Sequence, residues 1–134
     1  EAIAMTDHGA LYGAVDFYRE ATARGIKPII GVEAYVAPGS RHSRERGDSS
    51  PYHLVMLARN MTGYKNLIAL VTKANLEGYY YKPRIDRELI EQYSAGITVL
   101  SGCPSAEFHR RVQEGDREGA IAAARYYREK GLLK

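Results

Sequence analysis

Short apolar segments alternate with helical segments along this chain, and that alternation limits the folds it can adopt. Residues 2–5 form an apolar run that ends in a turn at residues 6–9. Residues 10–24 carry apolar side chains at helical spacing, and residues 29–36 are again apolar and extended. A strand, a helix and a second strand in this order indicate a parallel strand pair joined by a right-handed crossover.

The alternation continues to the end of the sequence. A polar loop over residues 38–50 comes next, and it is longer than the usual connection of ~4–6 residues. Two more strands are expected, at residues 54–58 and 97–100, together with helices at residues 60–76, 86–93, 105–114 and 116–130. Strands interleaved with helices are typical of an α/β fold, either an open doubly wound sheet or a barrel.

Composition excludes several classes of protein. Hydrophobic residues at 45% and charged residues at 26% are typical of a globular chain rather than a disordered one. The single cysteine excludes an internal disulfide framework, and no apolar run reaches the ~20 residues that span a bilayer. A cytoplasmic protein without a membrane partner is therefore expected. The chain begins at Glu1 inside an apolar segment, so residues 1–134 are interpreted as one partial domain truncated at both ends, with no second domain.

Four residues with metal-binding side chains fall near the predicted strand ends. His8 and Cys103 lie in turns that directly follow strands, Glu33 interrupts an apolar strand, and His53 precedes another strand. Imidazole, carboxylate and thiol groups are the ligands that zinc prefers. Each residue also has a structural interpretation: a turn histidine, a solvated carboxylate, a half-buried histidine and a small core residue. Their spacing is not that of a zinc finger, so the argument depends on a shared position at one edge of the sheet.

His53 fits that shared edge only under one further hypothesis. At the start of a strand parallel to residues 29–36, His53 would lie at the opposite end of the sheet. If residues 28–36 and 53–58 instead form a hairpin with a long loop, His53 starts where the preceding strand finishes. The helical segments between residues 58 and 97 then return the chain to the original direction.

Basic residues suggest a second kind of site, on a chain whose net charge is +3. Arg41, Arg44 and Arg46 cluster in the long loop, and Lys82 and Arg84 follow a run of three tyrosines. These five residues are candidates for contact with nucleic acid, with the tyrosines stacking on bases. The alternative is a solvated loop beside a packed extended connection. Asp7 is expected to cap the helix that follows it, and His42 and His109 are expected at the surface.

Several segments taken together resemble one known family. They are AIAMTDHG (2–9), GIKPIIGVE (25–33), PYHLVMLA (51–58), YYKPRID (80–86) and LSGCP (100–104). In this order they resemble the N-terminal PHP (polymerase and histidinol phosphatase) domain of bacterial replicative polymerases, the DNA polymerase III alpha-subunit family. The resemblance implies part of a distorted (β/α)7 barrel, with mostly parallel strands, helices outside and a metal cluster at one face. His8, Glu33, His53 and Cys103 match metal-ligand positions of that cluster.

The resemblance also implies function. A multinuclear zinc centre is expected, with manganese or magnesium as alternatives, and it would support 3′→5′ exonuclease proofreading in a DNA-directed DNA polymerase. The partners would be DNA at the primer 3′ end, the remainder of the polymerase chain and other replisome subunits. A non-catalytic scaffold and a histidinol-phosphatase-like phosphoesterase remain alternatives. A His-x-His motif and an Asp-x-His pair of the family lie outside these residues, so the isolated piece is expected to be inactive.

Overall fold

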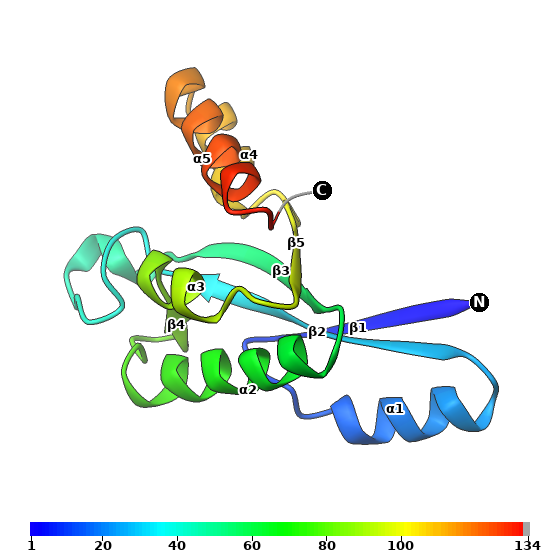
Figure 1. Cartoon of the computed structure of the whole chain (residues 1–134). Helices are drawn as coiled ribbons and strands as arrows, with labels where there is room; N and C mark the ends of the chain where they lie inside the picture. The colour runs from blue at the N-terminus through cyan, green and yellow to red at the C-terminus, as the bar shows by residue number, and fades with distance from the viewer. Residues whose placement is uncertain (133–134) are drawn as a thin grey trace.

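The computed structural model describes residues 1–132, which form one mixed sheet with helices packed around it (Figure 1). Five strands make up the sheet, and the path β1-β2-β3-β5 gives their order, with β4 paired to β2 beside that path. Their bounds are β1 (Ala2–His8), β2 (Lys27–Val36), β3 (Tyr52–Ala58), β4 (Arg84–Ile85) and β5 (Ile97–Leu100). The predicted α/β class is therefore confirmed.

Strand directions differ from the mostly parallel arrangement that was expected. β2 pairs in parallel with β1 and β4, but β3 is antiparallel to both β2 and β5. The connection from β2 to β3 contains only the short 3₁₀ helix η1 (Arg46–Ser49), without a crossover helix that could return the chain for a parallel strand. The long-looped hairpin hypothesis is thus confirmed. Within residues 1–132 the sheet is open and mixed: β3 alone runs opposite to the other four strands, so the expected arrangement holds in part.

The helices largely follow the sequence pattern. They are α1 (Ala14–Ala23), α2 (Met61–Leu76), α3 (Arg87–Tyr93), α4 (Glu107–Gln113) and α5 (Arg117–Glu129). α1 begins four residues later than expected because Asp7 Oδ2 accepts a hydrogen bond from the Gly13 N–H (3.1 Å), which holds the preceding residues in a turn. Asp7 therefore holds the turn that precedes α1, but it does not cap the helix: the N-cap residue is Gly13 and has no side-chain capping bond, so the expected cap was wrong. Among the described residues, no helix has the length and apolarity to cross a bilayer.

The core lies between the sheet and the helices α2 and α3. Val32 and Met56 from the sheet pack against Leu67 of α2 and Ile90 of α3, and each is at most 1% exposed. Asn60 starts α2 by accepting a hydrogen bond from the Gly63 N–H, and Asp86 starts α3 by accepting one from the Leu89 N–H. α4 and α5 form a hairpin that projects beyond β5, away from α1 and α2 (Figure 1).

Gly63 offers a test of this packing, because two effects of Gly63→Ala have opposite signs. Alanine normally favours a helix by about 1 kcal/mol over glycine. A Cβ at Gly63, however, would lie 2.0 Å from the carbonyl oxygen of Gly96, where α2 approaches the turn before β5. We expect the clash to dominate and the free energy of unfolding to fall by about 1–3 kcal/mol in urea denaturation.

The exposed neighbour Thr62 provides the control for this variant. Thr62→Ala changes the same helical turn without a close contact, and should alter the free energy of unfolding by about 0.5 kcal/mol or less. A stabilising Gly63→Ala substitution would contradict the close approach of α2 to Gly96.

Candidate metal centre

Strand register brings the predicted ligands to one edge of the sheet. His8 at the end of β1 pairs directly with Glu33 of β2. His53 at the start of β3 pairs with Tyr35, which lies two residues beyond Glu33 and therefore on the same face. β5 runs antiparallel to β3, with Leu100 opposite Val55, so the chain that leaves β5 carries Cys103 toward His53.

The four side chains contact one another through their ligand atoms. Glu33 lies between the histidines: His8 Nε2 is 3.2 Å from its Oε2, and His53 Nδ1 is 2.8 Å from its Oε1. Cys103 Sγ lies 3.4 Å from His53 Nδ1 and 3.5 Å from Glu33 Oε1. The Glu33 and His53 side chains are 15% and 22% exposed, whereas His8 is 60% exposed. Glu33 and His53 are thus largely shielded from solvent, whereas His8 is open to it.

Tyr35 orients the two histidines, a role that the sequence analysis missed. Its ring lies edge-on to the His53 ring, at 5.1 Å between centroids, and is nearly parallel to the His8 ring at 6.3 Å. Gly9 makes room for this ring, because its φ is +64° and an added Cβ would lie 2.9 Å from Tyr35 Cε2. The alternation of side chains along a strand, counted from Glu33, could have singled out Tyr35.

The donor set fits a divalent metal. His8, Glu33 and His53 each offer an atom within 4.8 Å of the other two. At the usual Zn–N and Zn–S bond lengths, tetrahedral geometry places pairs of donor atoms about 3.3–3.7 Å apart. The contacts that Cys103 Sγ makes with His53 and Glu33, at 3.4 and 3.5 Å, fall in that range. The distances from Glu33 to His8 (3.2 Å) and to His53 (2.8 Å) are shorter than it. One carboxylate and two imidazoles could therefore hold an ion, and the Cys103 thiol lies in contact with two of these three groups.

Two of the basic candidates are buried and have structural partners. Arg41 is 7% exposed and Arg84 is 0% exposed, so neither guanidinium is free to contact nucleic acid. Arg84 donates hydrogen bonds to the carbonyl oxygens of Gly78 (3.0 Å), Ser43 (2.7 Å) and Arg41 (3.0 Å). The expectation of nucleic-acid contact is not retained for these two residues, because a charge seen in the sequence does not reveal its buried partners.

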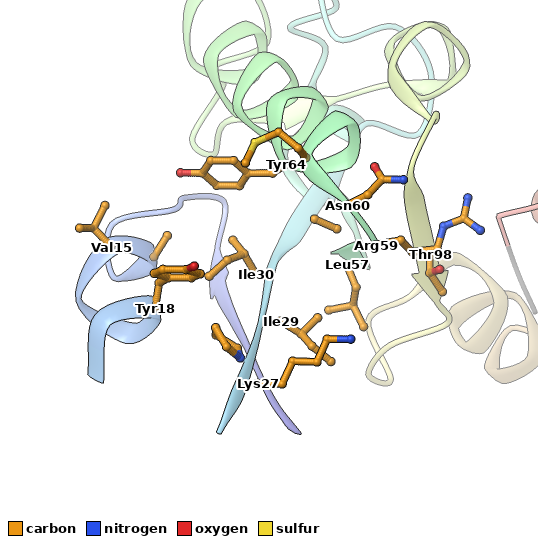
Figure 2. Close-up of a pocket in the computed structure, with 14 residues that line it drawn as sticks. Val15, Tyr18, Lys27, Ile29, Ile30, Leu57, Arg59, Asn60, Tyr64 and Thr98 are labelled. Atoms are coloured by element: carbon orange, nitrogen blue, oxygen red, sulfur yellow. The ribbon is translucent and has the colours of Figure 1, made fainter. Parts of the chain in front are cut away.

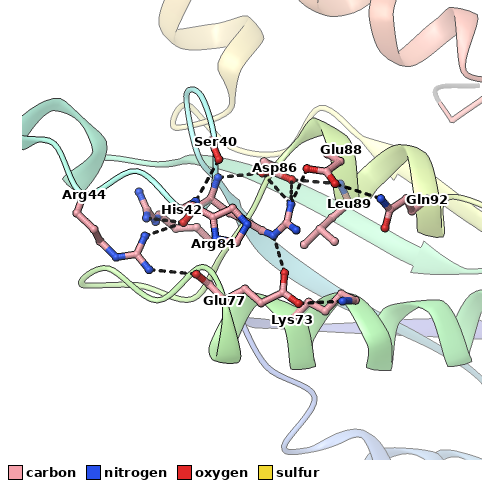
Figure 3. A network of polar contacts seen from close by, with 11 residues as sticks. Ser40, His42, Arg44, Lys73, Glu77, Arg84, Asp86, Glu88, Leu89 and Gln92 are labelled. Atoms are coloured by element: carbon pink, nitrogen blue, oxygen red, sulfur yellow. Dashed lines mark hydrogen bonds and ion pairs between the residues drawn. The ribbon is translucent and has the colours of Figure 1, made fainter.

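Arg41 is the centre of an ion-pair network that ties the long loop to α2 and α3. Figure 3 shows its partners Glu77, Asp86 and Glu88. Its guanidinium donates to both Asp86 oxygens (3.1 Å), Glu77 Oε2 (2.8 Å) and Glu88 Oε2 (3.0 Å). Although burial opposes it, hydrogen bonding to these carboxylates raises the pKa of Arg41 above its ordinary value. Hydrogen bonds from Lys73 and Arg41 lower the pKa of the Glu77 carboxyl. The loop is therefore anchored at Arg41 and is not a freely solvated segment.

The remaining basic candidates are exposed. Arg44 and Arg46 lie on the outer part of the loop, where Arg44 donates to the carbonyl oxygens of Arg41 (2.8 Å) and Glu77 (3.0 Å). Lys82 is also exposed, and its Nζ lies 5.4 Å from the centroid of the Tyr35 ring, beside the candidate metal centre.

The two other histidines differ in exposure. His42 is exposed, as expected. His109 is only partly exposed, and its buried Nδ1 has no hydrogen-bond partner, so the expectation of a solvated side chain was wrong. The helical position beside Arg110 and Arg111 had suggested solvent, but the ring packs edge-on against Phe108.

An apolar groove of about 680 Å³ lies away from the candidate metal centre (Figure 2). It runs between α1 and the start of α2, beside the first residues of β2 (27–30). Its lining residues include Tyr18, Ile30, Leu57 and Tyr64. None of the four candidate ligands lines this groove. The groove and the metal centre are separate features of the structure.

Helices on a mixed sheet, with imidazole, carboxylate and thiol groups gathered at one edge, define an α/β domain with a candidate metal centre. Residues 1–131 match the sequence pattern described as the PHP domain, and the chain belongs to that family. The DNA polymerase III alpha subunit of Thermus aquaticus is 57% identical over 109 residues, which are 79% of this chain and 9% of the relative. That of Deinococcus radiodurans is 47% identical over 133 residues, 96% of this chain and 10% of the relative.

The same subunit from Chlamydia pneumoniae is 54% identical over 107 residues, which are 78% of this chain and 9% of the relative. The chain thus spans about a tenth of the length of these three relatives.

Removal of one ligand should weaken metal binding. We expect His53→Ala to lower the affinity for zinc by more than the ~10–100-fold that loss of an outer-shell partner costs. Competition with a chromophoric chelator at neutral pH measures this affinity. The exposed loop residue His42 supplies the control, since His42→Ala removes an imidazole that lies outside the cluster. Equal zinc affinities for the two variants would contradict the assigned ligand set.

The ion-pair network predicts a large effect on stability. Asp86→Ala leaves Arg41 without its buried partner and α3 without its capping side chain, so the free energy of unfolding should fall by about 3–5 kcal/mol. Glu88 contacts the same guanidinium but is 63% exposed, and Glu88→Ala should cost about 1 kcal/mol or less. Urea denaturation of the two variants measures both values. Similar losses would show that burial does not distinguish the two ion pairs.

Proposed function

We propose that this domain, in its complete protein, is a metal-dependent 3′→5′ exonuclease that proofreads DNA within a polymerase III alpha subunit. The observation that supports this proposal is the convergence of His8, Glu33, His53 and Cys103 at one open edge of the sheet. The polymerase relatives connect that site to DNA synthesis, where a nuclease that acts on the primer 3′ end has a clear use.

The side chains would divide the task of holding and orienting a metal. Glu33 contacts both histidines and so fixes their rings, while Tyr35 packs against them from the next position on the same face. His8 is the most exposed of the two histidines and Glu33, so a substrate approaching from solvent meets it before the less exposed side chains. A divalent ion bound here supplies Lewis-acid stabilisation for the negative charge that develops during phosphodiester hydrolysis.

Zinc is the metal that the donor chemistry favours. A thiol and two imidazoles are softer ligands than the oxygen donors that magnesium prefers. Manganese remains an alternative through its affinity for carboxylate and imidazole groups. We propose that the complete domain adds further ligands, holds more than one ion and closes the sheet into a (β/α)7 barrel.

The proposed setting is a bacterial replication complex in the cytoplasm. The matched region is about a tenth of the relatives' length, so polymerase activity is assigned to the remainder of the chain. The partners would be DNA with a primer 3′ end, that remainder and other replisome subunits. Residues 1–134 are one partial PHP domain in this proposal.

Primer shortening by the full-length protein tests the activity. We expect the full-length protein with zinc or manganese, and without nucleotides, to remove a mispaired 3′ nucleotide. His8→Ala should reduce the rate by at least about 100-fold, the scale on which loss of one transition-state contact acts. An unchanged rate of primer extension on paired primers would show that the His8→Ala variant is folded.

Other outcomes assign other functions. A full-length protein that extends primers but never shortens them would contradict the exonuclease and favour a scaffold. Shortening that persists in His8→Ala would place the nuclease elsewhere. Hydrolysis of a small phosphate monoester, by a parent protein that ends soon after the barrel, would instead favour a histidinol-phosphatase-like enzyme.

A further inference from the structure

We propose that the turn at residues 80–83 is a phosphate-binding element of the same site, in which Lys82 contacts a phosphate of the polynucleotide strand. This inference rests on the proposed function, because it names how that site would hold its substrate. The feature that supports it is a turn with an unusual backbone conformation, held by contacts on both sides. Near the candidate ligands it presents a lysine without an ion-pair partner in the described part of the chain.

Lys82 reaches the edge of the metal centre through Tyr35. Its Nζ lies 5.4 Å from the centroid of the Tyr35 ring, and the same ring contacts both His53 and His8. A single aromatic ring therefore separates the ammonium group from the candidate ligands. A cation held over an aromatic face keeps a preferred position while its remaining donors stay available to an anion.

The turn has an unusual backbone. Tyr81 has a φ of +58°, a conformation that residues other than glycine adopt rarely. The Tyr80 N–H donates to the Lys82 carbonyl oxygen (3.0 Å) and closes the turn around Tyr81. Strain of this kind persists where surrounding contacts enforce it, and such positions cluster at functional sites.

Buried contacts on both sides enforce this turn. The Arg84 guanidinium lies 5.2 Å from the Tyr80 ring centroid and is fixed by the Gly78 and Ser43 carbonyl oxygens. Pro83 packs against Gly9: a Cβ added to Gly9 would lie 3.0 Å from the Cγ of Pro83. The buried arginine thus supports the turn that presents Lys82, although it cannot itself contact the strand.

Charge and exposure point to a polynucleotide as the ligand. No carboxylate lies within 4.0 Å of Lys82 Nζ among the described residues, so the ammonium is not neutralised there. Tyr79 and Tyr81, which are 57% and 70% exposed, both precede Lys82 in the sequence, and Tyr81 is its direct neighbour. A lysine beside exposed aromatic rings is the combination that binds phosphates and stacks on bases of single strands.

Residue-resolved lysine acetylation of the full-length protein tests this contact without requiring catalysis. A short oligothymidine should slow the acetylation of Lys82 by at least about fivefold, measured by mass spectrometry, because a bound phosphate occludes the amine. Lys65, exposed on α2, should react at the same rate with and without the oligonucleotide.

The outcomes separate this proposal from the proposed exonuclease. Protection of Lys82 in a protein without exonuclease activity would support the phosphate contact and refute the nuclease. Primer shortening without protection of Lys82 would support the nuclease and overturn the contact. Protection by inorganic phosphate but not by oligothymidine would assign the turn to a small phosphate ester, and would also overturn the proposal.

Salt dependence supplies a second readout where shortening is observed. Lys82→Ala should raise KM with little change in kcat, and should make the logarithmic salt dependence of kcat/KM less steep by about 0.7, the value for one contact to a single strand. Lys82→Arg keeps the charge and should restore the slope, and Lys65→Ala should not alter it. A slope unchanged in Lys82→Ala would contradict the contact.

Discussion

The antiparallel pairing of β2 with β3 is the constraint on which the candidate site depends. It places the start of β3 beside the end of β2, and so brings His53 to Glu33. A parallel β3 of the same seven residues would leave His53 about 20 Å away, at the other end of the sheet. The same pairing sets the direction of β5 and therefore the position of Cys103.

Buried charged residues hold the loop and the short strand that lie next to β2. Arg41 and Asp86 tie the long loop to α3, while Arg84 binds loop carbonyl oxygens and anchors the short strand β4 next to β2. Across residues 1–132 these groups form no hydrogen bond to the candidate ligands, yet Arg84 fixes the segment that carries Lys82. A loop that looked polar and solvated in the sequence is thereby fixed to α3 and to Arg84 by buried ion pairs and hydrogen bonds.

Local sequence patterns predicted the parts of the site that depend on strand ends. His8 and Cys103 follow apolar strands, and Glu33 interrupts one, so each was identified from its neighbours in the chain. His53 required a hypothesis about strand direction, because an apolar run has the same pattern in either orientation. That hypothesis was confirmed when the hairpin was found.

Burial of polar side chains could not be predicted in the same way. Arg41 and Arg84 were grouped with exposed cations because their partners lie between 6 and 47 residues away in the sequence. The unpaired ring nitrogen of His109 and the later start of α1 likewise depend on contacts that the local pattern does not contain. Periodicity gives the faces of helices and strands, whereas tertiary pairing decides which charges are enclosed.

The proposed function depends on the proposal that His8, Glu33, His53 and Cys103 hold one metal ion together. Diffraction at the zinc absorption edge, from crystals of the full-length protein grown with zinc, tests it most directly. The account predicts an anomalous peak at about 2.0–2.2 Å from the histidine nitrogens and the carboxylate, and about 2.3 Å from the thiolate sulfur. Zinc bound elsewhere in the protein, with these four side chains in contact only with one another, would contradict it.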